Sequence, residues 1–161
     1  MYNAEIVIRL PENCPFTKQH SDPDEAQMKG APSTTGLGMP NGGLLVANPS
    51  RALYDIILTQ LQEGSATQDY DFADQSLLSD LFHGRWVALP YVYNALKTMR
   101  WKGVHDAIWR DDCVKNIHYI LSPKPWDEER NGEHSEMHQL WWNVTEERYK
   151  HERGLGIEDG F

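Results

Sequence analysis

The chain has 161 residues, 40% of them hydrophobic and 24% charged, and its six Trp and seven Tyr indicate a packed core rather than a disordered segment. A formal net charge of -9 argues against a general nucleic-acid binder, because neutralising phosphates requires clustered Lys and Arg, and the sequence has no such cluster. The sequence shows neither a signal-peptide pattern nor an apolar run of about 20 residues, so we expect a cytoplasmic protein without a membrane partner.

The first 42 residues contain one candidate strand and a long irregular segment. Three adjacent β-branched residues, Ile6 to Ile8, predict a strand within residues 1–10. Residues 11–42 mix five prolines with Gly, Ser and Thr, a composition that predicts no regular element beyond one helical turn near Glu25–Met28. A loop of this length inside a compact domain indicates a functional segment, disorder or missing upstream structure.

The middle of the chain alternates apolar runs with helical patterns. The run over 43–47 predicts a buried strand, and Ser50 is a suitable N-cap for an amphipathic helix over 51–62. A second helix is predicted over 72–82, and a short strand over 86–89. Residues 92–101 fit either a helix or an irregular aromatic element.

The last third contains one more strand and one more helix. Residues 114–120 predict a strand, 127–134 a polar loop, and 137–153 a final helix. This order is an α/β signature, with too few strands for a complete nucleotide-binding sheet. We therefore expect one partial domain over 1–161, made of an irregular lead-in (1–40), a motif region (41–126), and a polar loop with a C-terminal helix (127–161).

The two cysteines, Cys14 and Cys113, match no metal or redox spacing. They fit a reducing compartment, and a single disulfide between them is the alternative.

Residues 40–43 form the first pattern that suits ligand binding. The two glycines allow the backbone to approach a ligand closely, and the Asn41 amide can both donate to and accept from a sugar hydroxyl. A turn that starts a strand is the alternative for the same residues.

Asp71, Asp74 and Gln75 form a second pattern, at the predicted start of the helix over 72–82. In helical geometry the two carboxylates lie on nearly one face, where they can grip sugar hydroxyls or stabilise positive charge at an anomeric carbon. Acidic residues in a first helical turn also complement the helix dipole, which explains the pattern at least as well.

Two further patterns follow downstream. Asn94 comes after a predicted strand, where its amide can line a pocket. His118, near a strand end, can offer a neutral imidazole to a divalent metal. Lys124, held between two prolines, can place its ammonium on a diphosphate. A core histidine and a solvated lysine are the alternative.

Taken in order, these patterns resemble the C-terminal motif series of the family 8 glycosyltransferases, the relatives of glycogenin and galactinol synthase. The matched stretch runs from about residue 40 to 126, and it is similar to fungal members of the family. The motifs are an Asn-small-Gly that opens a strand, an Asp-Gln pair with an upstream acid, an Asn after an aromatic residue, and a His-aromatic step with a Lys-Pro-Trp beyond. Here they are Asn41, Gly42 and Gly43; Asp74, Gln75 and Asp71; Asn94; and His118, Tyr119, Lys124, Pro125 and Trp126.

The resemblance implies the C-terminal half of a GT-A fold, an incomplete mixed sheet with flanking helices. Such enzymes bind a nucleotide sugar with a manganese ion (Mn2+) and transfer the sugar with retention of anomeric configuration. The implied partners are a nucleotide-sugar donor, UDP-hexose first, and a sugar or polyol acceptor. The implied roles are catalytic for Asp74, Gln75 and Asp71, metal-ligating for His118, and substrate-binding for Asn41, Gly42, Gly43, Asn94 and Lys124, with Asp74 nearest to the anomeric carbon.

The sequence departs from the family pattern in two places. Of its two Asp-x-Asp strings, 22–24 follows no apolar strand and 69–71 overlaps the sugar-site motif, so neither matches the string that supplies the family's other metal ligands. Leu121-Ser122 stands where the family usually has a glycine after its histidine. We therefore expect a missing nucleotide-binding half, weak or no activity of the chain alone, and self-association through an uncovered sheet edge.

Two alternatives to an enzyme stay open. The first is a non-catalytic carbohydrate-binding or interaction protein derived from such a transferase. The second is a fragment without independent stability.

Overall fold

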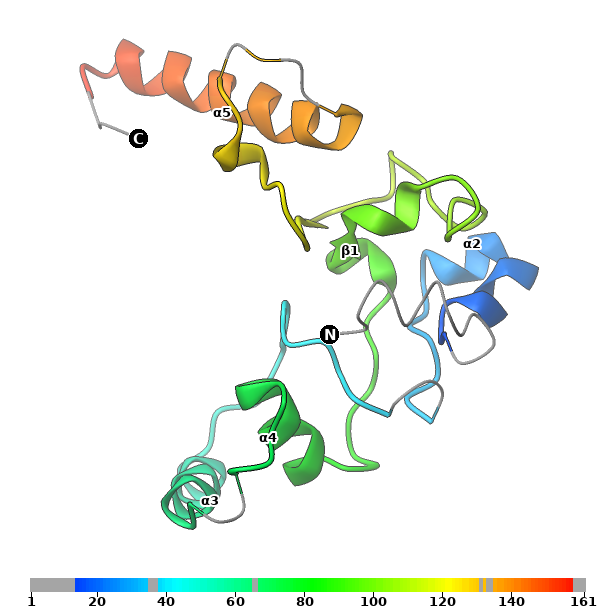
Figure 1. Cartoon of the computed structure of the whole chain (residues 1–161), viewed down its shortest axis with the longest axis vertical. Coiled ribbons are helices and arrows are strands. Elements are labelled where there is room, and N and C mark those ends of the chain that lie inside the picture. Colours follow the sequence, from blue (N-terminus) through cyan, green and yellow to red (C-terminus); the bar gives the residue numbers. More distant parts are fainter. Residues whose placement is uncertain (1–13, 35–37, 65–66, 131, 133–134, 158–161) are drawn as a thin grey trace. The chain divides into compact units, whose positions relative to one another are not determined.

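The computed structural model describes residues 14–34, 38–64, 67–130, 132 and 135–157, and the chain divides into two compact units, Met1–His118 and Tyr119–Phe161. The predicted strand within residues 1–10 lies outside the described residues. The first unit contains, in chain order, the 3-10 helix η2 (Thr17–Ser21), α2 (Pro23–Ala26), α3 (Arg51–Gln62), α4 (Ala73–Leu81), η3 (Tyr91–Tyr93), β1 (Ala95–Leu96), η4 (Lys97–Arg100) and β2 (Ile117–His118) (Figure 1).

The segment over 14–34 is more regular than the loop that we predicted. It forms η2 and the single turn α2, which begins two residues before the expected turn near Glu25–Met28. Asp22 Oδ1 accepts a hydrogen bond from Glu25 N at 2.9 Å, and Pro23 occupies the first helical turn. An acidic N-cap followed by proline is a strong helix start, so this proline begins an element instead of preventing one.

The two amphipathic helices α3 and α4 are confirmed (Figure 1). Ser50 caps α3, as its Oγ accepts a hydrogen bond from Leu53 N at 3.1 Å. No residue of α3 is buried, whereas α4 buries Leu77 and its neighbouring serines. The helical pattern of α3 therefore produces a helix that the described residues leave largely uncovered.

The predicted buried strand over 43–47 and the predicted short strand over 86–89 are wrong. Residues 45–50 and 85–90 have no regular secondary structure, and Val46 and Val87 are 82% and 89% exposed. A strand needs a neighbour that pairs with its N–H and C=O groups. Within the described residues no ladder forms beside either segment, so β propensity alone leaves both apolar runs open to solvent.

The sheet of the first unit has two short parallel strands. Ala95 in β1 pairs with Ile117 in β2, and Leu96 pairs with His118. The strand predicted over 114–120 is thus only two residues long, and 92–101 is an irregular element with β1 at its centre. Helices with a small parallel sheet are compatible with an α/β fragment.

The core of the first unit lies around β1. Its buried apolar side chains include Tyr91, Val92, Ala95, Leu96, Met99, Ile108 and Trp109. The Tyr91 hydroxyl lies 2.9 Å from Ile108 O and accepts from Arg110 N at 2.9 Å. These bonds tie residues 108–110, which follow β1 in the chain, to Tyr91 in η3, and burial raises the pKa of the Tyr91 phenol.

The second unit contains η5 (Pro125–Asp127) and the long helix α5 (Glu136–Gly154), drawn in orange to red in Figure 1. The predicted final helix is therefore confirmed. Ser135 caps α5, and the Tyr119 hydroxyl donates to Met137 O at 2.8 Å. Burial raises the pKa of Tyr119 to about 12.

Leu121 has a φ of 63°, in the left-handed region that favours glycine. Leu121 stands where the family pattern usually has a glycine. The backbone there keeps a glycine-like conformation although the side chain is a leucine.

None of the helices in the described part of the chain has the length and hydropathy of a membrane-spanning segment.

Candidate functional site

The turn Asn41–Gly43 lies at the centre of a polar cluster in the first unit. Asn41 Oδ1 accepts two hydrogen bonds, from Gly43 N at 2.8 Å and from Asn94 Nδ2 at 2.9 Å. Gly42 N donates to Gln75 Oε1 at 2.8 Å. Three motifs that are separate in the sequence therefore meet at one turn.

The start of α4 supplies the acidic side of this cluster. A Cβ placed on Gly42 would lie 3.6 Å from Asp74 Oδ2, so the Asp74 carboxylate lies beside the turn. Asp74 is exposed, whereas Gln75 is only 8% exposed. Asp71 lies in the turn before α4 and not on the helix, so the two carboxylates do not share a helical face as we predicted.

His118 closes the cluster from the sheet side. It is the last residue of β2, and a Cβ on Gly43 would lie 2.7 Å from its Cε1 and Nδ1 and 2.9 Å from Asn41 Oδ1. A side chain at position 43 would force His118 or Asn41 to move, which favours glycine there. The structure thus brings Asn41, Gly42, Gly43, Asp74, Gln75, Asn94 and His118 together, and their roles toward a ligand stay predictions.

Lys124 belongs to the second unit. Its ammonium donates to Tyr119 O at 2.5 Å, and its backbone N–H donates to Asp127 Oδ2 at 3.0 Å. The lysine predicted to contact a diphosphate is therefore held by its own loop.

The donor set around His118 does not by itself suit a manganese ion. A divalent cation of this kind takes several oxygen and nitrogen ligands. Among the described residues, no three His, Cys, Asp or Glu side chains gather closely enough to hold one. His118 would be one ligand among others that the described residues do not supply.

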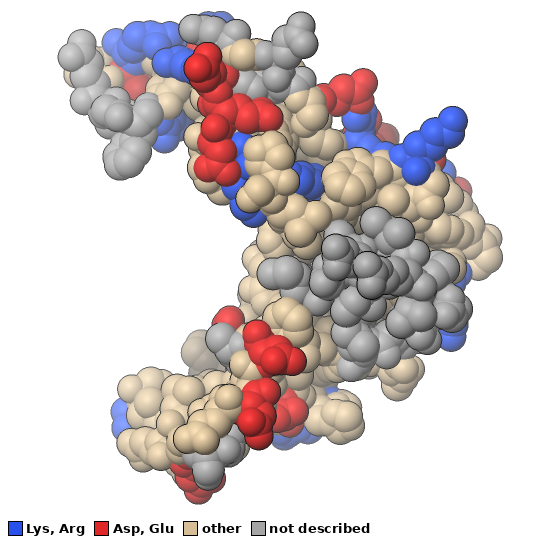
Figure 2. Space-filling model, in the orientation of Figure 1, with Lys and Arg blue, Asp and Glu red and all other residues tan. Residues whose placement is uncertain are grey.

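Acidic side chains gather over α4 and the turn before it (Figure 2). Asp71, Asp74 and Asp80 are all exposed there. This surface suits hydroxyl-rich, uncharged groups better than an unaccompanied phosphate, since carboxylates accept hydrogen bonds and repel anions.

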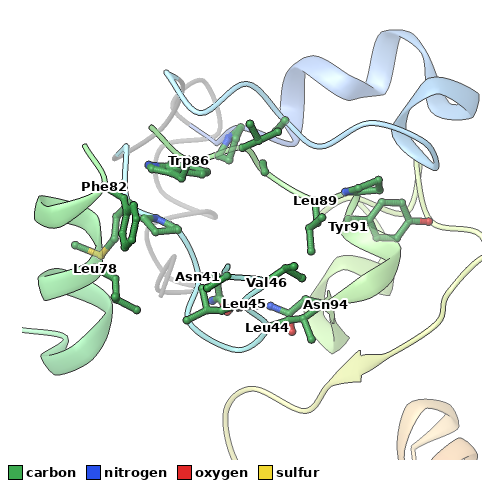
Figure 3. Close-up of a pocket in the computed structure, with 18 of the residues that line it drawn as sticks. Asn41, Leu44, Leu45, Val46, Leu78, Phe82, Trp86, Leu89, Tyr91 and Asn94 are labelled. Atoms are coloured by element: carbon green, nitrogen blue, oxygen red, sulfur yellow. Dashed lines mark hydrogen bonds between the residues drawn. The ribbon is translucent and has the colours of Figure 1, made fainter. Parts of the chain in front are cut away.

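An apolar cavity of about 560 Å³ borders the cluster (Figure 3). Asn41 and Asn94 lie on one side with Leu44 to Val46, while Phe82 and Trp86 lie on the other. Much of the wall comes from the two irregular segments that we expected to be strands. A volume in this range is typical of small-molecule pockets.

Sequence patterns gave no hint of a second cluster, formed by Cys14, His20 and His105. His105 Nε2 lies 3.2 Å from Cys14 Sγ, and its Nδ1 lies 2.9 Å from His20 Nε2. Burial, followed by the neighbouring His20, lowers the pKa of His105 to about 4, and burial raises the pKa of the Cys14 thiol. Both cysteines are free thiols, and no local signal could pair residues 85 and 91 positions apart.

Residues 20–130 match the family model described as glycosyl transferase family 8. This stretch includes every member of the cluster around Asn41–Gly43. The chain belongs to glycosyl transferase family 8.

Relatives of this family 8 chain include plant and bacterial proteins. Galactinol synthase 1 of Solanum lycopersicum is 30% identical over 65% of the chain and 33% of its own length. Galactinol synthase 7 of Arabidopsis thaliana is 29% identical over 74% of the chain and 36% of its own length. A probable glycosyl transferase of Streptococcus gordonii is 30% identical over 63% of the chain and 15% of its own length.

The chain spans about a third of the length of the galactinol synthases that it matches. No solved structure matches it significantly.

Proposed function

We propose that the first unit carries the sugar-binding part of a retaining family 8 glycosyltransferase that uses a nucleotide-sugar donor. The observation that supports this function is the cluster at Asn41–Gly43, where an asparagine, two glycines, an exposed carboxylate and a histidine meet. Amides and carboxylates at a glycine turn can bind several hydroxyls of one sugar ring at once.

Asp74 has the central chemical role in this proposal. Its exposed carboxylate accepts hydrogen bonds from hydroxyls and stabilises positive charge at an anomeric carbon as the leaving group departs. Asn41 directs its oxygen into the turn, and its NH2 group is the part offered to a sugar oxygen.

The donor part of the proposal is a UDP-hexose with Mn2+ in a GT-A fold, and the acceptor is a sugar or a polyol. The names of the galactinol synthases among the relatives support such an acceptor. His118 would be one metal ligand and Lys124 a diphosphate contact. Further metal ligands and the nucleotide pocket would come from residues outside this sequence, in keeping with its span of about a third of those relatives.

The test titrates the purified chain with hexoses, polyols and UDP-hexoses, with and without MnCl2, while amide chemical shifts are recorded. We expect weak, metal-independent sugar binding that shifts Gly42 and Gly43, and no measurable turnover. Asp74→Asn should weaken this binding by about tenfold, because a hydrogen bond to a charged group contributes about 1.5–3 kcal/mol.

Asp112→Asn is the matched control, since it removes the same charge from another exposed position of the first unit. Equal effects of the two variants, or shifts confined to other residues, would contradict the proposed sugar site. Micromolar UDP-hexose binding with Mn2+-dependent turnover would show that the chain itself completes the donor site.

We also propose that the chain interacts with a second copy through two uncovered segments that lack regular secondary structure. Residues 45–50 and 85–90 present apolar side chains, with Val46 and Val87 among the most exposed. Backbone N–H and C=O groups without a ladder partner can pair with another chain, and identical segments in two copies can pair reciprocally. This surface is also what the alternative of a non-catalytic interaction protein would use.

Replacing both Val46 and Val87 by lysine is expected to shift the sedimentation of the chain from an oligomer to a monomer, because charge on such a surface opposes pairing. Val144→Lys, at a position of α5 that is 68% exposed, is the control and should leave the oligomer unchanged. A parent chain that is monomeric at all concentrations would rule out the association.

A further inference from the structure

The two side-chain amides that meet the Asn41–Gly43 turn have fixed orientations. Gly42 N–H is a donor, so the atom of Gln75 that faces it at 2.8 Å has to be the carbonyl oxygen. Gly43 N–H likewise fixes Asn41 Oδ1 as the acceptor, at 2.8 Å. The atom of Asn94 that lies 2.9 Å from the same Oδ1 is therefore its NH2 group.

Both groups of the Gln75 amide already have protein partners. Its oxygen holds Gly42, its nitrogen lies 3.2 Å from Met39 Sδ, and the residue is only 8% exposed. A sugar hydroxyl would have to displace a backbone hydrogen bond to reach the carbonyl oxygen. Leaving the part-buried Gly42 N–H without its acceptor is unfavourable, which disfavours this exchange.

We propose that Gln75 and Asn94 are positioning residues that hold the Asn41–Gly43 turn in its binding shape. Gln75 acts as an acceptor and Asn94 as a donor. Both act on a ligand through the turn, which leaves the Asn41 NH2 group and the Asp74 carboxylate as the groups that meet a sugar. That the turn binds a sugar rests on the proposed function, whereas the positioning of the turn by Gln75 and Asn94 does not.

These opposite roles make opposite demands on amide-to-acid substitutions. A glutamate at position 75 keeps an oxygen for Gly42 N–H, whereas an aspartate at position 94 has no proton to donate at neutral pH. An aspartate at 94 also sets a negative charge against Asn41 Oδ1. Gln75→Glu should therefore preserve the turn, and Asn94→Asp should disrupt it as much as Asn94→Ala does.

The test records the amide chemical shifts and solvent-exchange rates of Gly42 and Gly43 in the ligand-free chain. We expect Gln75→Ala to move the Gly42 amide upfield and speed its exchange by about fivefold, the effect of losing one ordinary hydrogen bond. Gln75→Glu should restore both values. Asn94→Ala and Asn94→Asp should each shift Gly43. Gln62→Glu and Asn143→Asp, at exposed positions, are the charge-matched controls and should leave both glycines unchanged.

The positioning role is overturned if Gln75→Glu perturbs Gly42 as strongly as Gln75→Ala, or if Asn94→Asp leaves Gly43 unchanged. Because no ligand is present, these outcomes do not depend on sugar binding. A second titration with the hexose separates the two proposals. If the Gln75 and Asn94 variants show the expected ligand-free shifts but the parent chain binds no sugar, the positioning role is supported and the proposed function is overturned.

Discussion

Replacing Gly30 with alanine is expected to destabilise the first unit by about 3 kcal/mol or more, at the upper end of the cost of overpacking. A Cβ at this position would overlap the carbonyl group of Ala88 and lie 2.7 Å from Leu89 O. These are backbone atoms, which cannot rotate away as a side chain would. The irregular segment over 85–90 would have to move away from residue 30, and with it one wall of the cavity.

The measurement is urea denaturation of the parent chain and the variant, followed by tryptophan fluorescence. Gly64→Ala is the matched control, because a Cβ at Gly64 meets nothing within 4 Å, and the change should alter the free energy of unfolding by less than about 1 kcal/mol. Similar midpoints for the Gly30 variant and the control would show that the approach of Gly30 to residues 88 and 89 is not needed for folding.

Lowering the pH from 7 to 5 is expected to cost the first unit about 2 kcal/mol of stability through His105 alone. The pKa of His105 falls from an ordinary 6.5 to about 4 in the folded chain, because the ring is buried and lies next to His20. Between these two pKa values, His105 is protonated in the unfolded chain and neutral in the folded chain. The contribution is complete above pH 6.5, declines as the pH falls, and is lost by about pH 4.

The groups that face this ring fix the sign of the effect. Cys14 and His20 hydrogen-bond its two nitrogens, and Phe16 packs edge-on at 5.5 Å between ring centroids. Asp106 opposes the shift, but its effect is smaller than those of burial and His20. His105→Gln should therefore flatten the dependence of unfolding free energy on pH between 7 and 5. His83→Gln, at an exposed histidine, should retain it, and an unchanged slope in the His105 variant would refute this assignment.

Local signals in the sequence determined the helices. Ser50 before an apolar repeat gave α3, and the repeat from Leu77 to Leu81 gave α4, because caps and helical periodicity act over a few residues. The final helix α5 followed in the same way. The apolar runs over 43–47 and 86–89 failed as strands, because a strand is completed by a partner that lies elsewhere in the chain or outside it.

The residues of the candidate site were named from short motifs, but only the tertiary structure decided how they meet. No sequence pattern indicates a bond between Asn94 and Asn41, or between Gln75 and Gly42, across separations of 53 and 33 residues. The sequence also could not indicate that Gln75 is buried and held by the backbone while Asp74, one residue earlier, is exposed. Residue types determine which bonds are chemically possible, whereas long-range packing determines which partners come within reach and how much water each group keeps.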